Sequence, residues 1–332
     1  MTDREIFIDP MTDYGFKRIF GLEVNKDLLI AFLNGLFRGR KRIVNLIYNQ
    51  NEYVGESTET GSVVFDLTCT AENGSQFIIE VQRTVQANLK KRMFYYGSKL
   101  VTDQAPRGDR RGWNYGISEV YVIVLMDGFR MPEGKRDGRF LHDICLMDRN
   151  TQEIFYEHFG FIYIELINFE KSEDELESDL DRWLFVLRNM SRLERLPLFF
   201  RKPIFEKLFH IAAYSKLNKE ERQMYDRSLR DKWDAQSIRE SNEYYLKKAV
   251  EDGLKEGMEK GMEQGMEQGM KQGMKQGMEQ GMEKARLEAE SKRLEEVRAA
   301  VLRMLAKGLD KDLVADVLGL AISEVEKLSV DS

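Results

Sequence analysis

Residues 63–82 read VVFDLTCTAENGSQFIIEVQ, and this stretch decides the expected fold. Apolar and polar residues alternate on both sides of the Asn73-Gly74 pair, which is a frequent turn signal. The alternation predicts two antiparallel strands, 63–70 and 76–82, each with an apolar face of odd-numbered residues. The opposite, polar-leaning face carries the even-numbered residues Val64, Asp66, Thr68, Thr70, Gln76, Ile78, Glu80 and Gln82.

The length of the turn decides whether Asp66 and Glu80 share one side of this strand pair. A two-residue turn at Asn73-Gly74 sets odd-numbered residues opposite even-numbered ones, so it mixes apolar and polar groups on each face. A three-residue loop at 73–75 keeps the faces separate and sets Asp66 opposite Gln82, with Glu80 diagonal on the same side. We therefore predict a three-residue loop or an equivalent bulge.

Carboxylates at this spacing point to metal chemistry. Asp66 and Glu80 supply the hard oxygen ligands that Mg²⁺ prefers. A bound Mg²⁺ lowers the pKa of a coordinated water and stabilises charge on a phosphate that is being displaced. Gln82 can orient the attacking water by a hydrogen bond, although it brings no positive charge. The same alternation is also typical of an exposed hairpin whose polar residues face solvent, and the pattern alone does not separate the two interpretations.

The remaining periodicity predicts an α/β domain with an all-helical C-terminal extension. Strands are expected at 43–48, 63–70, 76–82, 120–126, 140–147 and 161–169. Helices are expected at 25–37, 86–102, 173–190, 204–214 and 219–250.

A low-complexity segment follows the expected helices. Glycine recurs every four residues, at Gly253, Gly257, Gly261, Gly265, Gly269, Gly273, Gly277 and Gly281. The charged and amide residues between the glycines exclude a hydrocarbon environment. On a helix each repeat drifts by about 40°, which favours right-handed winding, and each glycine weakens the helix by about 1 kcal/mol relative to alanine. We interpret the segment as a marginal helix or spacer that becomes firm when it packs against a partner.

The last residues predict a small helical unit that resembles a helix-turn-helix. An amphipathic helix is expected at 297–307 and ends at Gly308; Asp310 caps a helix at 311–318, Gly319 forms a turn, and Ser323 caps a helix at 324–328. The final helix is acidic where a recognition helix should present donors to DNA. Oligomerisation or docking is therefore favoured over groove reading.

The totals exclude several classes of protein. The chain has 332 residues, a net charge of −6 and two cysteines, Cys69 and Cys145, which excludes a disulfide framework and fits a reducing compartment. No apolar run approaches the roughly 20 residues that span a bilayer, and the opening MTDREIFIDP does not resemble a signal peptide. We expect a cytoplasmic protein without a membrane segment.

Absent motifs narrow the chemistry further. There is no P-loop, dinucleotide fingerprint or serine nucleophile elbow, and the three histidines lack zinc-ligand spacing, so no small-molecule cofactor is expected. The negative net charge argues against nucleic-acid binding, but basic residues cluster locally and can still hold phosphates. These basic patches are Arg38–Arg42, Lys90–Arg92, and the set Arg107, Arg110 and Arg111.

Four segments of the chain resemble a known family. They are IDPMTDYGFKRIFG at 8–21, FDLTCTAENGSQFIIEVQ at 65–82, KKRMFYYGSKL at 90–100 and FIYIELINF at 161–169. The chain resembles the recombination-promoting nuclease/putative transposase family, which belongs to the PD-(D/E)XK nuclease superfamily. The resemblance implies a restriction-endonuclease-like mixed sheet flanked by helices, and a metal-dependent DNA endonuclease that promotes recombination. We therefore expect a nuclease core at 1–172, a helical extension at 173–250, a glycine-repeat spacer at 251–290 and the small helical unit at 291–332.

The resemblance also assigns the site residues. Asp66 matches the active-site aspartate and Glu80 the second acid, so these two are the expected ligands of Mg²⁺ or another divalent cation. Gln82 stands at the superfamily's lysine position; it departs from the superfamily but agrees with this family's E-x-Q form. The expected catalytic residues are Asp66, Glu80 and Gln82.

Four residues are expected to contact DNA. Arg92, Tyr96 and Lys99 recur at helical spacing and can hold phosphate and stack on DNA, and Lys17 belongs to the opening motif with Asp13, Phe16 and Phe20. The alternatives are that Tyr96 packs on the sheet while the cations are solvated, and that Asp13 either adds a carboxylate or caps the first helix.

The expected partners are DNA and further copies of the chain, bound through the C-terminal helices. Two other functions remain open from the sequence: a non-catalytic interaction protein that self-associates through its helical arm, and a DNA-binding, transposase-like accessory protein.

Overall fold

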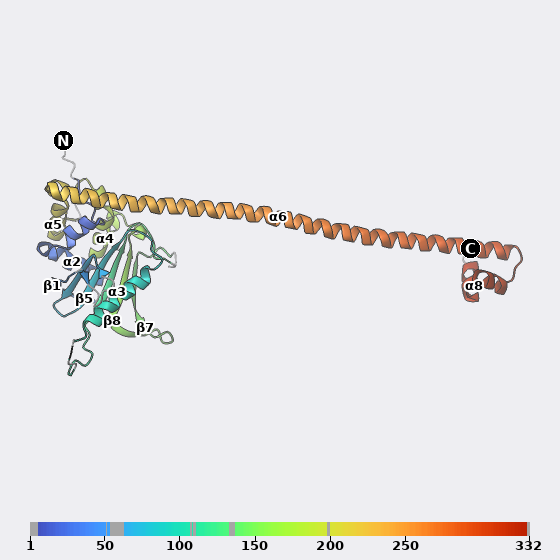
Figure 1. Ribbon diagram of the computed structural model, residues 1–332, viewed down its shortest axis with the longest axis horizontal. Coiled ribbons are helices and arrows are strands. Elements are labelled where there is room, and N and C mark those ends of the chain that lie inside the picture. The colour runs from blue at the N-terminus through green and yellow to red at the C-terminus, as the bar shows by residue number, and fades with distance from the viewer. Residues whose placement is uncertain are drawn as a thin grey trace. The chain divides into compact units, whose positions relative to one another are not determined.

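The structure, a computed structural model, describes residues 6–50, 52–53, 63–106, 108, 111–132, 137–197 and 200–330. The chain divides into two compact units, Met1–Tyr244 and Tyr245–Ser332. The first unit contains all the strands and is built around a mixed sheet (Figure 1).

The central sheet has six strands in the order β1-β4-β5-β6-β8-β7. These strands are β1 (Leu46–Tyr48), β4 (Leu67–Ala71), β5 (Gln76–Gln82), β6 (Val120–Met126), β7 (Leu141–Met147) and β8 (Ile154–Glu165). β5, β6 and β8 are parallel, whereas β1, β4 and β7 run antiparallel to their neighbours. Because parallel strands end at the same edge, the carboxyl ends of β5, β6 and β8 lie together. A second pair, β2 (Glu52–Tyr53) and β3 (Val63–Val64), is antiparallel.

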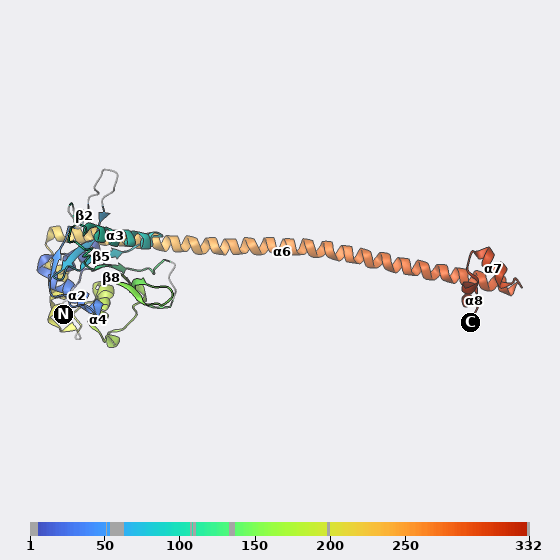
Figure 2. The same ribbon diagram turned by 90° about the horizontal axis from the view of Figure 1, so that it is seen from below.

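Helices cover both faces of the sheet (Figure 2). α1 (Asp13–Phe20), α2 (Lys26–Phe37), α4 (Asp179–Asn189) and α5 (Pro203–Ala212) pack on the face that carries the odd-numbered residues of β5. α3 (Leu89–Asp103) packs on the face that carries Ile78, where it contributes Leu89, Met93 and Leu100 to a smaller core. Short 3₁₀ turns connect these elements: η1 (Glu23–Asn25), η2 (Leu166–Asn168), η3 (Glu173–Glu175), η4 (Met190–Arg192) and η6 (Tyr214–Lys216).

The β4–β5 hairpin has the predicted loop length in a different place. The Ala71 N–H donates to the Ser75 carbonyl at 2.8 Å, so the three-residue loop is 72–74 rather than 73–75. Gly74 has φ +85°, the left-handed conformation that closes such a bulged turn. The strand partners run from Leu67↔Ile79 to Thr70↔Gln76, so the parity prediction is confirmed. The predicted pairing of Asp66 with Gln82 is wrong, since this register continues to Asp66 opposite Glu80.

The expected strand 63–70 is divided in two. β3 ends at Val64 and β4 begins at Leu67, so Phe65 and Asp66 stand in a break between them. The strand expected at 120–126 matches β6, whereas β8 begins at Ile154 rather than at 161.

The capping predictions have mixed outcomes. Asp310 accepts from the Leu313 N–H at 2.8 Å and Gly319 is left-handed, as predicted for α7 (Lys311–Leu318). Ser323 lies inside α8 (Ile322–Val330), so the prediction that it caps this helix is wrong. Thr12 rather than Asp13 caps α1, because its side chain accepts from the Gly15 N–H at 3.0 Å.

The glycine repeat is helical. α6 (Lys219–Ala306) runs through it without interruption, and joins the helices expected at 219–250 and 297–307. At the end of the chain, α6, α7 and α8 share a small core of Val301, Val314, Ala315 and Val325. Among the described residues, no helix combines the length and apolar character required to cross a membrane.

Gly97 sets how closely α3 approaches the sheet. A methyl group at this position would stand 2.9 Å from the Phe159 ring and 3.1 Å from Val122. We predict that Gly97→Ala lowers the free energy of unfolding by about 1–3 kcal/mol despite the higher helix propensity of alanine. Urea denaturation measures the change. The neighbouring change Ser98→Ala should stay within about 0.5 kcal/mol of wild type; equal stability of Gly97→Ala and wild type would contradict the close packing.

Candidate active site

Asp66 is joined to β5 near the carboxyl end of the strand by a reciprocal pair of hydrogen bonds, one with Glu80 and one with the neighbouring Val81. The Val81 N–H donates to Asp66 Oδ2 at 2.7 Å, and the Asp66 N–H donates to Glu80 Oε1 at 3.2 Å. The break between β3 and β4 allows the first of these bonds, since the Asp66 side chain accepts an N–H of β5 just beyond the last β4 pair, Leu67↔Ile79. The two carboxyl groups therefore lie side by side.

The polar-leaning face of the hairpin is packed against other residues and not exposed to solvent. Glu80 and Gln82 are only 3% and 6% exposed, and Thr68 is fully buried. α3 packs over this face, so the interpretation as a hairpin with a solvent-facing polar side is wrong. A buried carboxylate needs compensation, because transfer of a charge out of water is costly.

Burial raises the pKa of both carboxyl groups. Desolvation, followed by the charge of Asp66, raises the pKa of Glu80 to about 8. Desolvation also raises the pKa of Asp66, although the Val81 N–H and the charge of Arg83 partly offset this effect. Each group thus favours the neutral form more than an exposed acid does, and a cation between them would reverse that preference.

Polar side chains surround the pair. Gln82 Nε2 donates to Glu80 Oε2 at 3.1 Å, so the residue at the lysine position holds the second acid. An Arg92 guanidinium nitrogen lies 3.8 Å from the same oxygen. On the other side, the charge of Lys17 lowers the pKa of Asp66, whereas the charge of Asp13 raises it.

The carboxylate oxygens of Asp66 and Glu80 suit a hard divalent cation that takes only some of its ligands from the protein. Among the described residues, no group of three or more His, Cys, Asp or Glu side chains is placed to hold a metal ion. Two carboxylates match the habit of Mg²⁺, which keeps several waters and takes phosphate oxygens as further ligands. Asp66 and Glu80 are the residues that would hold it.

The four residues predicted to contact DNA have different surroundings. Lys17, 52% exposed, pairs with Asp13 at 2.8 Å, and Arg92 lies against Glu80. Tyr96 packs edge-on against Phe65 with ring centroids 4.9 Å apart, which is the packing alternative stated for it. Lys99 is two helical turns beyond Arg92 and pairs with Asp103 at 2.8 Å.

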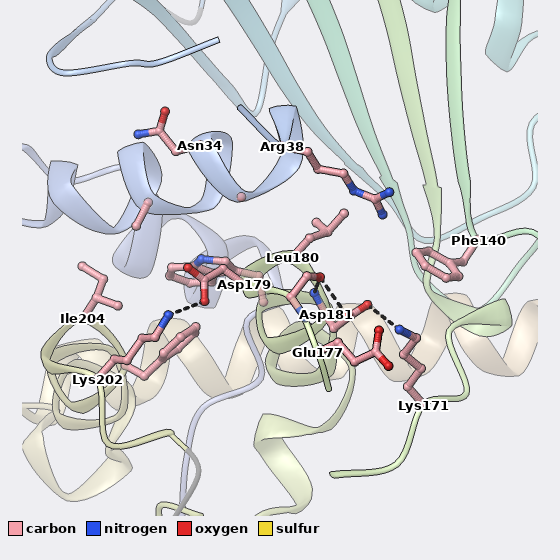
Figure 3. Close-up of a pocket in the computed structure, with 15 residues that line it drawn as sticks. Asn34, Arg38, Phe140, Lys171, Glu177, Asp179, Leu180, Asp181, Lys202 and Ile204 are labelled. Carbon is pink, nitrogen blue, oxygen red and sulfur yellow. Dashed lines mark hydrogen bonds and ion pairs between the residues drawn. The ribbon is translucent and has the colours of Figure 1, made fainter. Parts of the chain in front are cut away.

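Two residues of the basic patches form ion pairs away from Asp66 and Glu80. Arg40 pairs with Asp143 and Lys41 with Glu119. Arg38 lines a cavity of about 700 Å³ beside α2 and α4, in which Lys202 pairs with Asp179 at 2.5 Å and Lys171 with Asp181 at 3.1 Å (Figure 3). Its opposite charges are matched, so we assign no site there. Arg107 and Arg110 lie outside the described residues.

Sequence reasoning missed the cations that fix the strand ends. Lys232 of α6 bridges Asp9 and Asp127 at 2.7 Å each. Arg239 of α6 donates to the carbonyls of Arg83 and Asp127 at 3.2 and 3.3 Å. Arg83 follows Gln82 directly, so its position in the sequence could have indicated a residue close to the carboxyl pair. No sequence pattern pointed to Lys232 or Arg239.

These features define an α/β protein in which a buried and a partly buried carboxyl group lie side by side near the carboxyl end of a central strand of a mixed sheet. A family model described as PD-(D/E)XK nuclease family transposase matches residues 10–242. The chain belongs to this family, which confirms the resemblance and the restriction-endonuclease-like fold with its helical extension. No curated protein and no solved structure matched the chain.

The raised pKa of Glu80 predicts a pH-dependent effect of its removal. A carboxyl group with a raised folded-state pKa reduces stability as pH rises from about 4.5 towards 8. We expect Glu80→Gln to stabilise the metal-free chain by about 1–2 kcal/mol at pH 8 and to have little effect near pH 4.5. Denaturant unfolding at both pH values measures this.

Mg²⁺ provides the matched comparison. It should raise the Tm of wild type more than that of Glu80→Gln, because only wild type has two carboxylates for the ion. A Glu80→Gln variant that is less stable than wild type at pH 8 without metal would contradict the account.

Proposed function

We propose that this protein is a Mg²⁺-dependent endonuclease that hydrolyses phosphodiester bonds of DNA and promotes DNA recombination. The observation that carries the proposal is the reciprocal bonding of Asp66 with Glu80 and Val81, which holds the partly buried Asp66 carboxyl group beside the buried Glu80 carboxyl group. Membership of a family described as nuclease and transposase supports DNA as the substrate.

Each residue of the site has a proposed task. Asp66 and Glu80 hold the divalent ion, which when bound activates water and stabilises charge on the phosphate. Gln82 fixes Glu80 through its amide and helps to orient the attacking water. Arg92 is near enough to Glu80 to offset negative charge at the site, and its guanidinium is kept in place by the Tyr96 ring, 5.5 Å away.

The DNA is proposed to lie across α1 and α3. Lys17 and Arg92 carry positive charge on either side of the carboxyl pair, and Lys99 extends the same helix face. Tyr96 acts indirectly, by packing on Phe65 and beside the Arg92 guanidinium.

A second function is favoured by one observation. Gln82 stands where the wider superfamily has a lysine, and its amide donates a hydrogen bond to Glu80. The site therefore has no positive charge at this position. A chain that binds DNA as a transposase-like protein without cutting it fits that departure. The proposal further includes self-association through the C-terminal helices and, on the two free cysteines, a cytoplasmic location.

Asp66→Asn tests the catalytic assignment. The amide keeps the acceptor for the Val81 N–H but loses the charge that holds Mg²⁺, so plasmid nicking should fall by about two orders of magnitude. EDTA should abolish nicking by wild type. The control Asp143→Asn alters an exposed acid on β7 and should leave the rate unchanged. Equal nicking by wild type and Asp66→Asn would contradict the assignment; duplex binding without cleavage would favour the second function.

Lys17→Gln tests the proposed DNA path. Loss of one phosphate contact should weaken duplex binding uniformly across sequences and reduce the slope of log affinity against log salt by about 1. Fluorescence anisotropy in EDTA measures binding without cleavage. Lys207→Gln, which alters a cation paired with Asp27 outside the proposed path, serves as the control. The same salt slope in wild type and Lys17→Gln would remove Lys17 from the contact surface.

A further inference from the structure

Residues 253–284 of α6, within its orange part in Figure 1, form four columns of side chains. The glycine column is Gly253, Gly257, Gly261, Gly265, Gly269, Gly273, Gly277 and Gly281. The methionine column is Leu254, Met258, Met262, Met266, Met270, Met274, Met278 and Met282. The charged column is Lys255, Glu259, Glu263, Glu267, Lys271, Lys275, Glu279 and Glu283. The glutamine column is Glu256, Lys260, Gln264, Gln268, Gln272, Gln276, Gln280 and Lys284.

The methionine column is an apolar helix face that the described part of the chain leaves exposed. Its methionine side chains are 66–75% exposed, from Met282 to Met262. A methyl group added to any glycine of the glycine column would meet nothing within 4 Å in the part of the chain that the structure describes. Glycine weakens a lone helix, and exposed thioethers gain by burial, so both columns favour a packed partner.

The columns keep their order around the helix. Successive residues are about 100° apart, so the glycine and charged columns flank the methionine column on opposite sides, and the glutamine column lies at the back. All four columns drift together by about 40° per repeat. A second helix keeps the methionine column in contact only if the two helices wind around each other in the right-handed sense.

The charges of the charged column select a partner and a direction. In an antiparallel pair, each flank of one helix faces the same flank of the other, and flanking charges set orientation. With a two-fold axis at Gly269, Glu267 faces Lys271 and Glu263 faces Lys275, while Lys255 faces Glu283; only Glu259 meets a like charge, at Glu279. In a parallel pair the charged column faces the glycine column and finds no counter-charge.

One ion pair at the centre of the segment already forms within a single helix. Lys271 pairs with Glu267 of its own helix at 2.6 Å, and both side chains are exposed. The two-fold axis would set that pair against the reversed pair of a second copy, which gives four alternating charges. On the opposite flank the two glycine columns would meet directly, because Gly257 and Gly281 are also related by the same axis, as are Gly265 and Gly273.

We propose that residues 253–284 bind the same segment of a second copy in antiparallel orientation. The methionine columns interleave, the glycine columns let the helix backbones approach closely, and the charged columns face each other across the axis at Gly269. This inference rests on the proposed self-association of the C-terminal helices and names its face and direction. It does not depend on the nuclease assignment.

Charge exchange in the full-length chain tests the proposal. Glu263→Lys with Glu267→Lys makes the centre of the charged column entirely basic, and Lys271→Glu with Lys275→Glu makes it entirely acidic. Sedimentation velocity should show that wild type dimerises and that each variant alone associates about tenfold more weakly or worse. An equimolar mixture of the two variants should recover the dimer, since every central contact then joins opposite charges.

Two further measurements fix the face and the direction. Gln268→Glu with Gln272→Glu adds two charges at the back of the helix and should leave dimerisation unchanged. Under oxidation, a mixture of Glu263→Cys and Lys275→Cys chains should form more cross-linked dimer than either variant alone, with wild type as the background for Cys69 and Cys145.

Three results would overturn the proposal: a monomeric wild type, dimerisation that both charge variants leave unchanged, or self-cross-linking of Glu263→Cys alone that matches the mixture. Dimerisation with insensitive charge variants would refute this face while the broader self-association stands. Plasmid nicking by the same variants reports separately on the nuclease.

Discussion

Near the carboxyl end of β5, the Asp66 carboxylate accepts the Val81 N–H and the Glu80 carboxylate accepts the Asp66 N–H. This exchange uses a side chain on one strand to continue the hydrogen bonding of its neighbour beyond the point where β4 stops. The strand break at Phe65–Asp66 allows this exchange, whereas the cover of α3 buries Glu80, and burial raises the pKa of both acids. A regular strand through Asp66 would leave its side chain perpendicular to the sheet, where it could not bond to a backbone N–H of β5.

Burial of two acids side by side weakens the fold unless other groups compensate. The protein supplies neutral donors and distant cations instead of a tight ion pair: Gln82 donates to Glu80, and the Arg92 guanidinium stands 3.8 Å away. The compensation is incomplete, as the raised pKa values of both acids indicate. α3 is part of this arrangement, since it both buries the acids and carries Arg92, and Gly97 permits its close approach.

The two parts of α6 differ in whether their side chains find partners within the chain. Its first turns lie in the same compact unit as the sheet, where Lys232 and Arg239 neutralise and bond the ends of β5 and β6. Its glycine repeat has no packing partner among the described residues, and its apolar side chains stay exposed. Helical periodicity is the same in both parts; the difference lies in which residues find a partner within the chain.

The sequence by itself determined the elements and the parity of the hairpin. Alternation placed Glu80 and Gln82 on one face, the apolar run 120–126 defined β6, and Asp310 and Gly319 marked the ends of α7, because these signals depend on neighbours in the chain. The expected alternation failed at Phe65, which packs in the core beneath α3, because the strand breaks at Phe65–Asp66. Family motifs singled out Asp66 and Glu80 as the candidate acids. The tertiary structure decided the hairpin register, which differs by two residues from the predicted one because the turn closes at Gly74. It also decided that α3 covers this face and buries Glu80. It also decided the bridge from Asp9 through Lys232 to Asp127, since contacts between residues more than 100 positions apart leave no local pattern to read.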